Sequence, residues 1–191
     1  ASDFEGHPKL APAVIGGATR QASVKAGLEA IAAHGPEAVI VHDGVRPLVA
    51  PAVITATLEA LAVADGALAA LAVTDTLLKA RDGIVEAQVD RRELHGAQTP
   101  QAFRFAPIIA AHRAAAVLRE REFTDDASLL EWQQRRVVLV AGDPDNIKIT
   151  TPQDFARAAR ILGPKGERRQ HTGIGFDVHA FCAGDHVMLA G

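Results

Sequence analysis

The sequence has 191 residues, 48% of them hydrophobic, and a formal net charge of −3 at neutral pH. This length allows one α/β domain, or one domain and part of another. The near-balanced charge excludes a generally basic surface for nucleic acid, but not a local cationic pocket for phosphates. The single cysteine, Cys182, excludes an internal disulfide, and no apolar run reaches the roughly 18–20 residues of a membrane-spanning helix. We therefore expect a cytoplasmic protein without a membrane or nucleic-acid partner.

Helical and extended patterns alternate along the chain. After a turn at Gly16-Gly17, apolar spacing and capping residues predict helices over residues 20–34, 51–64, 107–121, around 129–132 and 151–162. Short apolar runs predict strands at residues 38–41, 67–73 and 137–141, the first two of them covered on both faces. This order predicts an α/β fold with a mainly parallel sheet and helices on both of its faces.

Residues 74–103 differ from this pattern. Two extended segments flank Asp82-Gly83, a dipeptide that favours a tight hairpin turn. The polar content of these segments predicts an arm that projects from the domain rather than a strand of its core.

The end of the chain changes in character. Residues 163–170 are polar and are predicted to form a linker, and residues 171–191 are rich in Gly and His. Twenty-one residues are too few to form a domain of their own. We interpret them as the beginning of a second α/β domain that the chain does not complete.

The first candidate site is the stretch "VHDGVRPLV", in which Asp43 and Arg46 follow the strand at residues 38–41. In parallel α/β sheets, ligands bind at the carboxyl ends of the strands. An acid at such a place can orient a hydroxyl group or hold a metal, and an arginine can bind phosphate with two hydrogen bonds. The alternative is a structural pair, in which Asp43 caps the loop and Arg46 lies on the surface.

Further hydroxyl-bearing and cationic residues stand at comparable places: Thr76, Arg91, Thr99, Thr124 and Lys148. Thr124 precedes a predicted helix, whose N-terminus attracts anions. Each residue has an ordinary alternative: Thr124 as a helix cap, Lys148 as a solvated lysine, and Arg91 as half of an exposed pair with Arg92. Together they would supply cations and hydroxyl groups to a phosphorylated ligand.

Asp177 and His179 form a D-x-H pattern near the end of the chain. On a strand, side chains two residues apart share a face, so this carboxylate and imidazole could bind one metal ion. A zinc site needs at least three protein ligands, and the spacing identifies two. The alternative is a chance D-x-H in a His-containing tail.

Six stretches, in this order, resemble the methylerythritol phosphate cytidylyltransferases: "GGATRQASVKAGL", "VHDGVRPLV", "VTDTLLKA", "VDRRELHGAQTPQAF", "FTDDASLLE" and "GDPDNIKITTPQDF". The tail "HTGIGFDVHAFCAGDHVMLAG" is similar to the opening of methylerythritol cyclodiphosphate synthase, and the two activities occur fused in some bacteria. The resemblance covers nearly everything after about Pro12 and implies a Rossmann-like fold. It implies a central piece of a bifunctional enzyme of isoprenoid precursor synthesis, with a cytidylyltransferase domain at residues 1–162 that lacks its N-terminal nucleotide-binding part.

The resemblance also implies a reaction, in which the phosphate of methylerythritol phosphate attacks the α-phosphate of CTP and releases diphosphate. Catalysis then consists of positioning and of neutralising phosphoryl charge, with the help of Mg²⁺. Asp43, Arg46, Thr76 and Lys148 match catalytic positions of the family; Arg91, Thr99 and Thr124 match substrate-binding positions; Gly17 and Ser23 match the cytidine-binding stretch. At Ala18 some relatives carry an acid, so the resemblance implies that one nucleotide contact is absent here or is made by the backbone.

For the tail, the resemblance implies a synthase domain that would cyclise CDP-methylerythritol phosphate with release of CMP. Asp177 and His179 match its metal ligands, usually for Zn²⁺, and a third histidine would follow Gly191.

The family implies a homodimer joined by the arm at residues 75–98, with Thr76, Arg91 and Thr99 acting in the partner's active site. A complete synthase domain would imply a higher oligomer. The family's Gly-rich loop that wraps the CTP triphosphate has no match here, so we expect these 191 residues alone to be inactive. The alternatives are a cytidylyltransferase for another phosphorylated alcohol and a non-catalytic scaffold that dimerises through its arm.

Overall fold

The computed structural model describes residues 11–118, 123 and 125–163. The predicted linker and the predicted second domain lie outside these residues, apart from Gly163, so the division of the chain into domains stays a prediction.

A four-stranded sheet with the order β1-β5-β2-β6 forms the centre of the fold. Three of its strands run in one direction: β1 (Ala38–Val41), β2 (Gly66–Ala72) and β6 (Val137–Ala141). β5 (His95–Arg104) runs against them, between β1 and β2. The prediction of a mainly parallel sheet is therefore confirmed.

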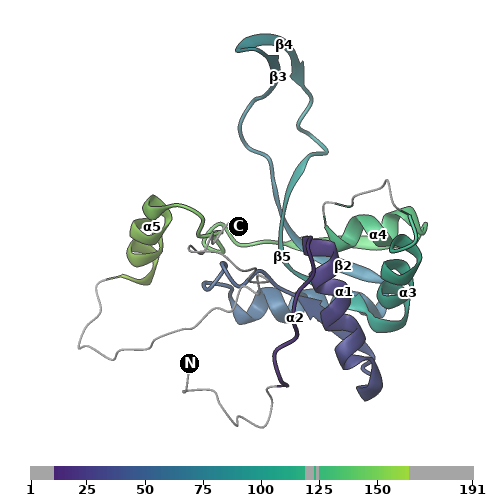
Figure 1. Ribbon diagram of the computed structural model, residues 1–191. Helices are drawn as coiled ribbons and strands as arrows, with labels where there is room; N and C mark the ends of the chain where they lie inside the picture. Colours follow the sequence, from purple (N-terminus) through teal and green to yellow (C-terminus); the bar gives the residue numbers. More distant parts are fainter. Residues whose placement is uncertain (1–10, 119–122, 124, 164–191) are drawn as a thin grey trace, which may run out of the picture.

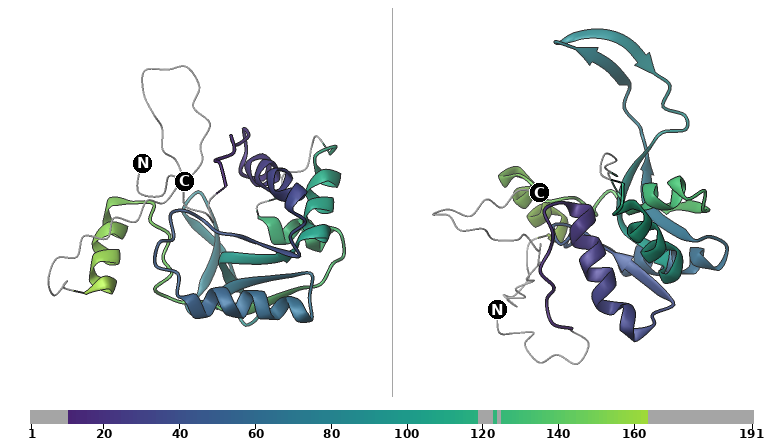
Figure 2. Two further views of the ribbon diagram at one scale, coloured as in Figure 1. Left: turned by 90° about the horizontal axis from the view of Figure 1, so that it is seen from below. Right: turned by 45° about the vertical axis from the view of Figure 1, so that its right-hand side comes forward.

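Helices cover both faces of this sheet, as predicted (Figure 2). One face carries α1 (Arg20–Ile31), α3 (Phe105–Ala115) and α4 (Asp126–Trp132), and the other carries α2 (Pro51–Glu59). Short 3₁₀ turns at Ala32–His34 and Ala60–Ala62 extend α1 and α2. Because side chains alternate along a strand, neighbouring β5 residues serve the two layers: Phe103 packs in the α1–α3–α4 core and Ala102 in the α2 core.

The first of these cores is densely packed. Phe103, Ile108, Leu129 and Leu130 are fully buried within it. A Cβ atom at Gly66 would lie 2.9 Å from side-chain carbons of both Leu130 and Phe103, closer than real contacts allow. β2 can therefore pass beneath this core only because residue 66 has no side chain.

Of the strands in the described sheet, β5 is the one that the sequence patterns missed. The prediction assigned residues 74–103 to a projecting arm because of their polar content. Residues 98–103 are nevertheless buried in the middle of the sheet. Its polar side chains are accommodated there by hydrogen bonds; Gln98, for example, exchanges a pair of them with the backbone of Asp143.

The arm itself is present as predicted. β3 (Leu77–Arg81) and β4 (Ile84–Val89) form an antiparallel hairpin that projects from the sheet (Figure 1). Asp82 and Gly83 have φ angles of 51° and 79°, as a two-residue type I′ turn requires.

β1 is half-buried rather than covered on both faces, because it has a single neighbouring strand within the described sheet.

α5 (Pro152–Leu162) begins with the expected capping box of Thr151 and Asp154, and it lies apart from the other helices (Figure 1). Among the described helices, none has the length and apolar character of a membrane crossing.

Candidate active site

The loop after β1 brings Asp43 and Arg46 together in a tight turn. The Arg46 backbone N–H donates to the Asp43 carbonyl over 3.0 Å, and Arg46 Nε lies 3.4 Å from Asp43 Oδ2. Arg46 Nη1 also donates to the carbonyl of Asn146 over 2.8 Å. Both charged side chains are largely buried, with exposed fractions of 13% for Arg46 and 19% for Asp43. The guanidinium is thus held from two directions.

Lys148 joins the same group from the loop after β6. Its Nζ lies 3.6 Å from Asp43 Oδ2, and its side chain is 42% exposed. One carboxylate therefore stands between two cations, which leaves a net positive charge at the carboxyl ends of two parallel strands. Such a group is suited to binding anions, and phosphate in particular.

Thr99 lies beside this turn and belongs to the same chain. Its Oγ1 accepts a hydrogen bond of 3.0 Å from the Asp43 backbone N–H, and its side chain is 5% exposed. The expectation that Thr99 acts in a partner's site is therefore wrong: it lies on the buried part of β5, beyond the arm, where the sheet places it next to β1.

Asn146 is a structural member of the site that the sequence patterns did not single out. Its fully buried side chain donates to the Thr99 carbonyl over 2.7 Å, while its own carbonyl accepts from Arg46. The Ile149 N–H also donates to the Val45 carbonyl over 2.8 Å. These bonds join the loops after β1 and β6 to β5. Asn146 stands in the stretch "DNIK", two residues before Lys148. The spacing of residues in the sequence did not indicate which loop Asn146 would contact.

The turn before α1 brings Gly17 and Ser23 together. Ser23 Oγ accepts from the Gly17 N–H over 3.0 Å and donates to the Thr19 carbonyl over 3.0 Å. A Cβ atom at Gly17 would lie 2.4 Å from the Cβ of Ala22. Residue 17 must therefore be glycine for the turn to fold back on the helix. Ala18 lies between them and has no polar side chain to offer a ligand.

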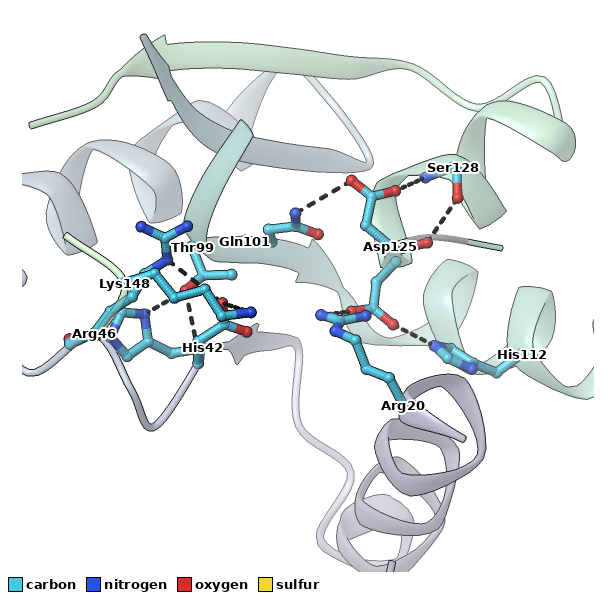
Figure 3. A network of polar contacts seen from close by, with 11 residues as sticks. Arg20, His42, Arg46, Thr99, Gln101, His112, Asp125, Ser128 and Lys148 are labelled. Carbon is cyan, nitrogen blue, oxygen red and sulfur yellow. Dashed lines mark hydrogen bonds and ion pairs between the residues drawn. The ribbon is translucent and has the colours of Figure 1, made fainter. Parts of the chain in front are cut away.

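A buried ionic group ties this turn to α4 (Figure 3). Asp126 is 1% exposed; its Oδ1 lies 3.0 Å from Nε2 of the fully buried His112, and its Oδ2 lies 2.8 Å from Arg20 Nη2. The contact with Arg20 is a close ion pair rather than an aligned hydrogen bond. Three helix segments, α1, α3 and α4, therefore meet at one carboxylate.

β5 connects two polar groups: that of Asp43, Arg46 and Lys148, and that of Asp126, His112 and Arg20. Thr99 and Gln101 are two residues apart and share a face of the strand. Thr99 contacts the Asp43 turn, while Gln101 Nε2 donates to Asp125 Oδ2 over 3.4 Å. Asp125 in turn caps α4 by accepting from the Ser128 N–H over 2.9 Å. Figure 3 shows the two groups, with Thr99 and Gln101 between them.

Thr76 and Arg91 lie together at the base of the arm, away from the Asp43 turn. They line one surface depression with Asp90 and Arg92, and the Arg91 guanidinium donates to the Thr74 carbonyl. The Arg92 side chain hydrogen-bonds to Asp90 and lowers the pKa of that carboxyl. Within one chain, the described structure does not bring Thr76 or Arg91 to Asp43.

Three predicted site residues, Thr124, Asp177 and His179, lie outside the described residues. In the part of the chain that the structure describes, no three His, Cys, Asp or Glu side chains are grouped as metal ligands. Among the described residues, Asp43 is the one carboxylate that pairs with Arg46 and Lys148. Mg²⁺ commonly binds one or two protein carboxylates together with substrate phosphates, so Asp43 fits a shared ligand of such an ion.

Comparisons with known proteins identify the family of this chain. The model of the family "2-C-methyl-D-erythritol 4-phosphate cytidylyltransferase" matches residues 2–164. The bifunctional enzyme IspD/IspF of Nitrobacter winogradskyi is 52% identical over 182 residues, which are 94% of this chain and 45% of that protein. The chain therefore spans less than half the length of this relative.

Solved structures show the same relationship. The 2-C-methyl-D-erythritol 4-phosphate cytidylyltransferase of Thermus thermophilus is 35% identical with a TM-score of 0.71, over 81% of this chain and 78% of that one. The bifunctional IspDF of Campylobacter jejuni is 30% identical with a TM-score of 0.62, over 74% of this chain and 35% of that one. Family model, sequence identity and fold agree: the chain belongs to the 2-C-methyl-D-erythritol 4-phosphate cytidylyltransferase family.

Proposed function

We propose that this chain contributes the cytidylyltransferase site of a bifunctional enzyme of isoprenoid biosynthesis. The site transfers the cytidylyl group of CTP to 2-C-methyl-D-erythritol 4-phosphate and releases diphosphate. The observation that carries the proposal is the placement of the Asp43 carboxylate between Arg46 and Lys148 at the ends of β1 and β6. The family membership supports the choice of substrates.

The chemistry requires charge neutralisation more than covalent work by the protein. A phosphate oxygen of the sugar phosphate forms a bond to the α-phosphorus of CTP, and the bond from that phosphorus to the diphosphate oxygen breaks. Arg46 and Lys148 stabilise the negative charge on the phosphoryl oxygens, and Asp43 keeps both cations in place. Since Asn146 also holds the Arg46 guanidinium, this cation needs little reorganisation when substrate binds.

The remaining assignments belong to the same proposal. Mg²⁺ would be shared by Asp43 and the phosphates and would supply further charge neutralisation when bound. Gly17 and Ser23 would hold the cytidine, with Thr99 and Thr124 near the sugar phosphate. Asp177 and His179 would hold Zn²⁺ in a synthase domain that cyclises CDP-methylerythritol phosphate and releases CMP.

We further propose a homodimer joined by the arm, with Thr76 and Arg91 reaching the partner's site. The arm projects from the sheet and exposes apolar side chains: Leu78, Ile84, Val85 and Val89. Exposed apolar side chains grouped in this way are typical of a surface that another protein covers. A complete synthase domain would imply a higher oligomer. The proposed location of the enzyme is the cytoplasm of a bacterium.

The experiment is a product assay on the longest native polypeptide that contains these residues. It is incubated with CTP, Mg²⁺ and either methylerythritol phosphate or ribitol phosphate, and the products are followed by phosphorus NMR. We expect diphosphate and CDP-methylerythritol from the first acceptor and no turnover of the second. Preference for ribitol phosphate would favour a cytidylyltransferase for another phosphorylated alcohol. No turnover of either acceptor would favour a non-catalytic scaffold that dimerises through its arm.

A further inference from the structure

His42 bridges the turn that carries Asp43 and Arg46. Its Nε2 lies 3.0 Å from the Arg46 carbonyl, and its Nδ1 lies 3.0 Å from Thr99 Oγ1 (Figure 3). Both ring nitrogens therefore have partners in the candidate active site, although the ring itself is exposed to solvent. None of the roles assigned above uses this side chain.

The partners define where the hydrogens lie. A backbone carbonyl can only accept, so His42 Nε2 must carry the hydrogen of that bond. Nδ1 of the neutral ring is then an acceptor, and the Thr99 hydroxyl donates to it. The Thr99 oxygen keeps its lone pairs for the Asp43 N–H, 3.0 Å away. The hydroxyl group is thus oriented by two partners, one on each side.

We propose that His42 is a positioning residue for cytidylyl transfer. It directs the Thr99 hydroxyl hydrogen toward itself, so that the Thr99 oxygen accepts from the backbone of Asp43. It also holds the far end of the same turn through the Arg46 carbonyl. The carboxylate of Asp43 and the guanidinium of Arg46 are thereby kept at a constant separation. This inference rests on the proposed function, since the groups it positions are those assigned to the reacting phosphates.

Two substitutions separate the two bonds of the ring. In His42→Asn the amide oxygen takes the place of Nδ1 and keeps the acceptor for Thr99, whereas the bond to the Arg46 carbonyl is lost. In His42→Gln the amide nitrogen takes the place of Nε2 and keeps the donor to Arg46, whereas the bond to Thr99 is lost. His42→Ala removes both. Since the ring is exposed, all three variants should fold.

The measurement is the steady-state kinetics of each variant, together with its thermal stability. We expect His42→Ala to lower kcat about tenfold or more while the KM for CTP changes less than about twofold, because small displacements of positioned groups act on the reacting geometry. His42→Asn and His42→Gln should each retain part of kcat. His34→Ala, at an exposed histidine of the turn after α1, is the matched control and should leave kcat unchanged.

A double-mutant cycle tests whether His42 acts through Thr99. On a Thr99→Val background, His42→Gln, which removes only the bond to Thr99, should lose most of its effect on kcat, whereas independent roles would give additive losses. Additivity, or an unchanged kcat in His42→Ala, would overturn the proposal. A loss of kcat that is matched by a loss of thermal stability would indicate a merely structural role and would overturn it as well.

A second measurement does not depend on activity. Nitrogen chemical shifts of isotope-labelled histidine report which ring nitrogen carries the hydrogen. We expect the His42 ring to carry it on Nε2, and Thr99→Val to change the shift of Nδ1. Hydrogen on Nδ1 of the neutral ring would refute the arrangement. Absence of product from the wild-type protein would contradict the proposed function alone, and the ring shifts would then still decide whether His42 orients Thr99.

Discussion

The buried group of Asp126, His112 and Arg20 leads to a quantitative prediction for Asp126→Ala. The substitution leaves His112, which is fully buried, with a donor that has no acceptor. An orphaned buried donor costs about 1–3 kcal/mol. The lost ion pair with Arg20 adds less, because that side chain is 40% exposed and water can solvate it. Breaking a buried pair as a whole costs about 3–5 kcal/mol, so we expect a loss near the lower limit, about 3 kcal/mol.

The assay is thermal and urea denaturation of the longest native polypeptide that contains the chain. A loss of about 3 kcal/mol should lower Tm by roughly 6–12 °C in a domain of this size. The double variant Asp126→Leu with His112→Phe removes both buried polar groups and should recover much of this loss, since apolar residues of similar volume often replace buried ion pairs without cost.

The surface pair of Arg113 and Glu29 provides the matched control. Arg113 Nη2 lies 2.6 Å from Glu29 Oε2, a shorter contact than any within the buried group, but the side chains are 56% and 34% exposed. Arg113→Ala should therefore change Tm far less than Asp126→Ala. The reasoning is refuted if Asp126→Ala lowers Tm no more than this control, or if the apolar double variant is less stable than the single one.

Three further predictions follow from the geometry. Gly66→Ala should destabilise the protein by about 1–3 kcal/mol, since its methyl group would lie 2.9 Å from core carbons; Gly27→Ala, with no atom within 4 Å, should be neutral or slightly stabilising in the same denaturation assay. Lys148→Met should lower kcat about a hundredfold at unchanged Tm, and an unchanged kcat would remove this cation from the proposed mechanism. The hydrogen bond from Arg113 lowers the pKa of Glu29 to about 2, so the stabilisation by this pair is present above pH 4.5 and is lost as the pH falls toward 2; carboxyl NMR titration of Arg113→Ala should show the pKa of Glu29 returning toward 4.5.

The sequence predicted the local elements well where a local rule applies. The strands at residues 38–41 and 137–141 coincide with β1 and β6, and the hairpin turn and the capping box of α5 are confirmed. Each of these depends on a few neighbouring residues: a continuous apolar run, an Asp-Gly dipeptide, or a threonine three residues before an acid. Such signals act within one or two turns of chain and need no knowledge of the rest of the molecule.

β5 could not be recognised in this way. Its polar residues Gln98, Thr99 and Gln101 suggested an exposed segment, although all three are buried. Their hydrogen-bond partners are far away in sequence: Asp143, Asp43 and Asp125. A buried polar side chain looks like a surface one until its partner is known, and only the tertiary structure supplies that partner.

The same distinction between local signals and tertiary contacts applies to the candidate site. The residue types at the ends of the predicted strands already indicated a place for phosphate, and they selected Asp43, Arg46 and Lys148. Sequence alone could not decide their distances, nor the bridging by His42. These contacts join residues as much as 105 positions apart, such as Asp43 and Lys148, through the pairing of β5 with β1 and of β6 with β2. Hydrophobic pattern determines which segments become strands, whereas the order of strands in the sheet decides which loops share an edge, because it depends on the packing of both faces at once.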